Sequence, residues 1–131
     1  MRSCAIARDI AIQGNAVQFE LTDIDEGTTL IRPGVRLDAL GVGRVESLLL
    51  AAVTSARPRI LIDLSGVDFI ASMGIHMLVS AARAAQTHGS YLALFGAQPL
   101  VARVFEQTAL ARVMTIVTDR EAALKATSTA Q

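Results

Sequence analysis

The 131-residue chain has no tryptophan, one tyrosine, four phenylalanines, three prolines and a single cysteine. Because 52% of its residues are apolar and so few are aromatic, we expect a folded chain with an aliphatic core. The lone Cys4 cannot form an internal disulfide, which excludes a disulfide scaffold and favours a reducing compartment. Twelve basic and twelve acidic residues cancel, so bulk charge attracts the chain neither to nucleic acid nor to anionic lipid.

Long hydrophobic runs are missing as well. The longest apolar stretch in a helical region, 48–53, is far shorter than the roughly 20 residues that cross a bilayer. Near the start of the sequence, Arg8 and Asp9 interrupt any signal-peptide core. We therefore expect one cytoplasmic domain, with no membrane insertion and no direct binding of nucleic acid.

Side chains that support catalysis or metal binding are sparse and scattered. His76 and His88 lie too far apart on one expected helix to share a metal, and we expect His76 at the surface. The glycines within 41–43 lack the preceding strand and the lysine of a phosphate-binding loop. The carboxylates within 23–26 are typical of a solvated turn. The sequence thus predicts no catalytic residue, no metal and no cofactor, and it disfavours an enzyme.

The apolar pattern predicts an α/β fold in which an opening β-hairpin precedes strands that alternate with helices. Strands are expected at 16–23, 28–32, 59–63, 91–95 and 115–117. Helices are expected after Asp38, from about Met73 to Gly89, from Pro99, and from a capping box at 118–121 to about Ala126. This order implies a mostly parallel central sheet covered by about four helices.

The same pattern sets the expected domain limits. Residues 16–126 are predicted to form the domain, and 127–131 a C-terminal tail. Residues 1–15 are expected to be an N-terminal extension, in which 5–12 could add a strand.

The segment 60–79 is the most informative part of the sequence. A buried strand ending at Asp63 leads through a loop with Ser65 and Gly66 to Ser72, which stands where a helix N-cap is expected. The Ser72 hydroxyl could simply cap the helix. It could instead be a modification site, whose phosphate would meet the positive end of that helix.

This segment resembles the STAS domain of bacterial anti-sigma factor antagonists. In the family's stretch D-L-S-x-V-x-F-[IM]-D-S-S-G, the first serine after the aspartate of D-S-S-G is phosphorylated. The matching residues are Asp63, Leu64, Ser65, Val67, Phe69, Ile70, Ser72 and Gly74. The segment 34–39 is similar to the family's G-x-L-D turn, and 98–105 is similar to its third helix. The resemblance covers roughly residues 16–126, and it implies the STAS fold.

The resemblance also implies a function. Unmodified, such a domain binds an anti-sigma factor that is a serine kinase of the GHKL type, and so frees the sigma factor. Phosphorylation, here of Ser72, releases the partner, and a serine phosphatase reverses the modification. The resemblance assigns the turn at Asp38 to kinase binding, although Asp38 could equally cap its helix. We expect Asp38 and the Ser72 loop at the same end of the sheet. Whether the protein forms a homodimer is left open by the sequence.

Two residues depart from the family pattern: Ala71 replaces an aspartate, and Met73 replaces a second small hydroxyl residue. These departures keep open an alternative, a STAS scaffold or subunit that is never phosphorylated, in a stress-signalling assembly or a lipid-transport ABC complex.

The helix after Ser72 carries a second apolar stripe, formed by Met73, Met77, Ala81 and Ala84. This stripe is either a partner surface or a widening of the buried face. As a partner surface, it completes the predicted partner-binding set, which consists of Asp38, Ser72, Met73, Gly74 and Met77.

Overall fold

The computed structural model describes residues 6–11, 17–25, 27–34, 36–54, 58–108, 110–112 and 114–128. Its elements follow one another as β1 (Ile6–Ala11), β2 (Val17–Asp25), β3 (Thr28–Pro33), α1 (Ala39–Val53), β4 (Arg59–Asp63), α2 (Ser72–Thr87), β5 (Tyr91–Phe95), α3 (Pro99–Gln107), the 3₁₀ helix η1 (Leu110–Arg112), β6 (Thr115–Ile116) and α4 (Arg120–Ser128). The predicted α/β order, with a hairpin before alternating strands and helices, is confirmed.

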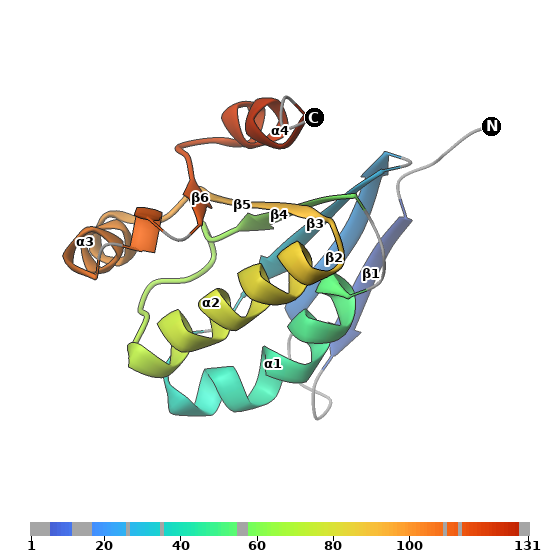
Figure 1. Ribbon diagram of the computed structural model, residues 1–131. Coiled ribbons are helices and arrows are strands. Elements are labelled where there is room, and N and C mark those ends of the chain that lie inside the picture. The colour runs from blue at the N-terminus through green and yellow to red at the C-terminus, as the bar shows by residue number, and fades with distance from the viewer. Residues whose placement is uncertain are drawn as a thin grey trace.

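The strands form one six-stranded sheet in the order β1-β2-β3-β4-β5-β6. The first three strands are antiparallel neighbours, whereas β3, β4, β5 and β6 run parallel. The parallel strands β3, β4 and β5 therefore end at the same side of the sheet, which we name the carboxyl edge. The helices α1, α2 and α3 begin there, because each follows one of these strands (Figure 1).

Helices cover both faces of the sheet, with α1 and α2 on one side and α4 on the other (Figure 1). Alternate side chains of a strand point to opposite faces, so the central strands are apolar on both. On the side of α1 and α2, the larger core cluster takes from these strands Ile31, Ile60, Ile62 and Leu94. On the side of α4, the smaller cluster contains Leu30, Leu61, Ala93, Phe95 and Ala123.

The two ends of the fold extend beyond the expected domain limits. β1 pairs antiparallel with β2, so the strand that the sequence left open within 1–15 is part of the sheet. α4 continues to Ser128, and the buried Thr127 hydroxyl donates to the Ala123 carbonyl at 2.9 Å. The predicted capping box at 118–121, which makes Thr118 the N-cap of the last helix, is wrong by one residue. Asp119 caps α4 instead, because its Oδ1 accepts from the Ala122 amide at 2.8 Å. Aspartate and threonine both cap helices, and spacing alone did not distinguish these neighbours.

Within the described ranges, no helix combines the length and the apolar character that a membrane span requires.

Candidate functional site: the carboxyl edge around Ser72

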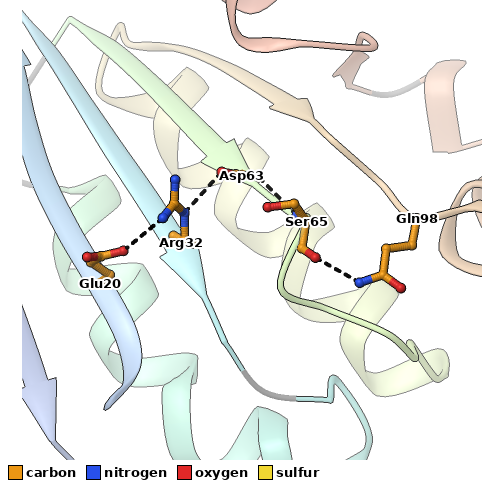
Figure 2. Close-up of polar contacts among 5 residues, drawn as sticks. All are labelled: Glu20, Arg32, Asp63, Ser65 and Gln98. Carbon is orange, nitrogen blue, oxygen red and sulfur yellow. Dashed lines mark hydrogen bonds and ion pairs between the residues drawn. The ribbon is translucent and has the colours of Figure 1, made fainter.

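The Asp63 carboxylate fixes the beginning of the loop that leads to Ser72. Asp63 ends β4 and is only 5% exposed. Its Oδ2 accepts from Arg32 Nε at 3.0 Å, and its Oδ1 accepts from the Ser65 amide at 2.9 Å. Arg32 also reaches Glu20 Oε1, at 3.3 Å, so one chain of polar contacts links β2, β3 and the loop after β4 (Figure 2). A buried carboxylate requires such partners, and here they hold the loop at its first turn.

The loop after β5 supports the same turn from the other side. Gln98 Nε2 donates to the Ser65 carbonyl at 2.7 Å (Figure 2). Gly96 has a φ of +75°, and a Cβ there would lie 2.9 Å from Asp63 Oδ1. Glycine is therefore required at position 96 both for its backbone conformation and for the close approach of the Asp63 carboxylate.

Farther along, the loop is hydrogen-bonded to the segment after β3. The Leu37 amide donates to the Phe69 carbonyl at 2.8 Å, and the Ala71 amide donates to the Leu37 carbonyl at 2.9 Å. These bonds form an isolated parallel bridge between Leu37 and Ile70. Asp38 follows Leu37 directly, so the predicted closeness of Asp38 to the Ser72 loop is confirmed. Its role toward a kinase stays a prediction.

Asp38 caps α1. Its carboxylate accepts from the Gly41 amide at 2.9 Å, and its backbone is extended, as an N-cap requires. Capping was one of the two roles expected of this residue, and its half-buried carboxylate performs it.

Ser72 does not cap α2, so that prediction is wrong by one residue. The N-cap is Ala71, whose backbone is extended and whose side chain offers no acceptor. Ser72 is the first helical residue; it is exposed, and its hydroxyl has no hydrogen-bond partner among the described residues. The sequence rule failed because it looks for a hydroxyl at the helix boundary, and the boundary here falls on an alanine. With capping excluded, the Ser72 hydroxyl is accessible and unused.

Two members of the predicted partner-binding set lie in the interior. Met77 is 1% exposed and belongs to the larger core cluster, together with the equally buried Ala81. Gly74 is buried where the first turn of α2 crosses Leu37. Neither Met77 nor Gly74 can contact a partner, so only Met73, at 52% exposure, remains of the stripe's large side chains. The buried face of α2 is wide because α1 packs along it.

Two exposed leucines that the sequence pattern did not single out accompany Met73. Leu40 is 67% exposed in the first turn of α1, and Leu100 is 55% exposed in the first turn of α3. These helices begin at the carboxyl edge, so Leu40, Met73 and Leu100 lie at the same edge of the sheet as Ser72. We name these three residues the apolar trio. Among the residues whose side-chain exposure the structure describes, the one other exposed large apolar side chain is Tyr91, which opens β5 at the opposite edge.

Charged groups near the loop pair with one another. Arg36 lies over the Phe69 ring, 4.7 Å from its centroid, and its Nε is 3.9 Å from Asp68 Oδ1. Both charged side chains are more than half exposed, so this pair stabilises the loop by about 1 kcal/mol or less. Across the described residues, no group of three or more His, Cys, Asp or Glu side chains could hold a metal ion.

Comparison with known proteins agrees with this geometry. The family model of the STAS domain matches residues 21–123, so the chain belongs to the STAS domain family. Among solved structures, a STAS domain protein from Planctomyces limnophilus, described as an anti-sigma-factor antagonist, is 29% identical, with a TM-score of 0.74 over 84% of this chain and 97% of that one. No curated protein matches the chain in sequence.

Two further structures share the fold at lower identity. An anti-sigma factor antagonist from Mycobacterium paratuberculosis is 20% identical, with a TM-score of 0.75 over 84% of this chain and 92% of that one. The Bacillus cell fate determinant SpoIIAA in its phosphorylated form is 21% identical, with a TM-score of 0.61 over 82% and 98%. The predicted STAS fold is confirmed.

We predict opposite effects for two helical glycines replaced by alanine. A Cβ at Gly74 would lie 2.7 Å from the Leu37 carbonyl oxygen and 2.7 Å from Ile70 Cγ1, so Gly74→Ala should lower the free energy of unfolding by about 1–3 kcal/mol. A Cβ at Gly43 in α1 meets nothing within 4 Å, so Gly43→Ala should raise it by about 0.5–1 kcal/mol. Urea denaturation measures both. A stable Gly74→Ala protein would show that α2 does not need this close approach.

A second pair of variants tests the caps. Asp38→Ala should destabilise the protein by about 1 kcal/mol, because it removes the acceptor of the Gly41 amide. Ser72→Ala should stay within about 0.5 kcal/mol of the wild type, because the hydroxyl makes no bond within the described chain. The same denaturation assay applies. A loss of about 1 kcal/mol at Ser72 would restore the capping role.

Proposed function

We propose that this protein is an anti-sigma factor antagonist that acts by partner switching. In its unmodified form it binds an anti-sigma factor that is also a serine kinase of the GHKL type. Phosphorylation of Ser72 releases it, and a serine phosphatase restores the binding form. The observation that carries the proposal is the exposed, unbonded hydroxyl of Ser72 in the first turn of α2, at the position where the family motif has its modified serine.

The surroundings of Ser72 suit such a switch. The apolar trio lies at the same edge of the sheet and exposes large side chains that a partner could bury. A phosphate adds about 1.5 to 2 negative charges at pH 7. Burying that charge in an apolar contact requires its desolvation, which opposes binding. A phosphate on Ser72 would therefore weaken a contact made by the trio.

The first turn of α2 can accommodate the added charge within the protein itself. The Ala71 carbonyl accepts from the Gly74 and Ile75 amides, whereas the amides of Ser72 and Met73 have no acceptor among the described residues. Free amides at a helix start favour an anion. The modified protein would thus stay folded while its docking surface changes.

The names of similar structures support the partner class. Two of the relatives are described as anti-sigma factor antagonists, and SpoIIAA was solved in a phosphorylated form. A switch of this kind would operate in the cytoplasm, where sigma factors and their regulators meet. A different observation favours the alternative of a scaffold that is never phosphorylated: Ala71 removes the carboxylate that the family pattern places directly before the serine.

The site assignment predicts the product of the kinase reaction. Incubation with ATP and the GHKL-type kinase encoded nearest to this protein's gene should place one phosphate on Ser72, detected by phosphopeptide mass spectrometry. Ser72→Ala should abolish the modification. Ser65→Ala is the matched control and should leave it intact, because Ser65 is an exposed serine of the same loop. Phosphate on Ser65 would refute the assignment, and a chain that stays unmodified would favour the scaffold.

The partner surface predicts a second result. Met73→Glu and Leu100→Glu should each weaken binding to the same kinase by about 1–3 kcal/mol in a calorimetric titration, as truncating a central interface anchor does. Tyr91→Glu is the control, because Tyr91 is 42% exposed but lies at the opposite edge of the sheet. All three side chains are exposed, so thermal melts of the free variants should agree with that of the wild type. Equal losses for all three variants would contradict the assigned surface.

A further inference from the structure

Ser72 stands at one end of a groove between α2 and α3. The groove has a volume of about 600 Å³. Its apolar wall is formed by Ile75 and Val79 of α2 and Val104 of α3. Its polar groups come chiefly from α2, where His76 and Arg83 line the groove together with Ser72. A group attached to the Ser72 hydroxyl would therefore share this groove with the basic side chains of the same helix.

His76 is the basic residue within reach of Ser72. The two residues are four apart in α2, so they occupy the same face one turn apart, about 6 Å along the axis. His76 is exposed, and its ring has no partner among the described residues. Arg83 is eleven residues from Ser72, about 16 Å along the helix, and is too distant for a direct bond.

Other charged groups do not compete for this position within the described ranges. From α3, the groove receives Val104 and Thr108, and the Thr108 hydroxyl already donates to the Val104 carbonyl at 2.9 Å. From the preceding loop it receives Ile70 and Ala71. No lining residue is acidic, so His76 has no carboxylate within the groove to pair with. The charged residue of that loop, Asp68, faces Arg36 of the segment after β3 instead.

We propose that His76 is the positioning residue for a phosphate on Ser72: its imidazole donates a hydrogen bond to the phosphate oxygens across one turn of α2. This inference rests on the proposed modification of Ser72. A protonated imidazole donates from both ring nitrogens, and its charge strengthens the bond to an anion. A phosphoserine gains its second negative charge near about pH 6, so the strength of the contact depends on pH around that value.

The test is a ³¹P NMR titration of protein that carries phosphoserine at position 72, introduced during synthesis so that no kinase is needed. A neighbouring cation favours the dianion, so the midpoint of the second ionisation should be lower in the wild type than in His76→Gln by about half a pH unit. His88→Gln is the matched control, because His88 lies at the far end of the same helix, where its Nδ1 is 2.9 Å from the Ala84 carbonyl oxygen. Its midpoint should equal that of the wild type.

Two results would overturn the contact. One is an equal ionisation midpoint of the phosphate in the wild type and in His76→Gln. The other is a lowered midpoint that is lost in Arg83→Gln but kept in His76→Gln. Binding of the same phosphoprotein to the kinase is measured separately, and it tests the switch. If the phosphate leaves binding unchanged while the midpoint still depends on His76, the proposed function fails and the contact stands. If binding is lost and the midpoints agree, the switch stands without His76.

Discussion

The hydrogen-bonded contact between Leu37 and residues 69–71 is the constraint on which the carboxyl edge depends. It joins the segment after β3 to the segment after β4, so that α1 and α2 begin side by side. Only a glycine at position 74 lets the first turn of α2 approach Leu37 this closely. Because the Leu37 carbonyl bonds the Ala71 amide, the last residue before the helix is fixed by the neighbouring loop. Ser72 is therefore positioned by backbone contacts that its own side chain does not make.

The Asp63 carboxylate performs a similar task at the beginning of the same loop. It is nearly buried, and each of its oxygens has a different partner, the Arg32 guanidinium and the Ser65 amide. Removing it would leave the Ser65 amide without its acceptor and Arg32 with Glu20 alone. The motif residues Asp63 and Gly74 are thus explained by architecture. The exposed hydroxyls of Ser65 and Ser72 make no hydrogen bond among the described residues, and of the two only that of Ser72 stands in the first turn of a helix, which favours it as the modification site.

The sequence predicted most accurately the bounds of elements whose apolar pattern fits only one type of secondary structure. The strands at 59–63 and 91–95 were placed at their observed bounds, because aliphatic residues on both faces admit little but a central strand. Helix starts were less certain, since Asp119 and Ala71 hold the caps that Thr118 and Ser72 were expected to hold. Local propensity does not decide between adjacent residues when a tertiary contact, such as that of Leu37, fixes the boundary.

It was harder still to predict from the sequence which residues of one helix are exposed and which are buried. Met73 and Met77 share a helical face, yet Met73 is exposed in the first turn of α2, whereas Met77 is buried one turn later within the larger core cluster. Leu40 and Leu100 were missed because each stands outside the periodic apolar face of its own helix. Only the shared edge of a parallel sheet brings such isolated residues to one side.

The departure at Ala71 has a physical consequence for the proposed switch. A carboxylate at the N-cap would bond the free amides of the first turn and place a negative charge beside a phosphorylated Ser72. With alanine there, those amides lack a side-chain acceptor from the cap, and the like-charge repulsion is absent. The same substitution removes an acidic feature that a kinase could recognise. Ala71 therefore favours a phosphate on Ser72 once it is attached and disfavours its attachment by a kinase that requires that aspartate.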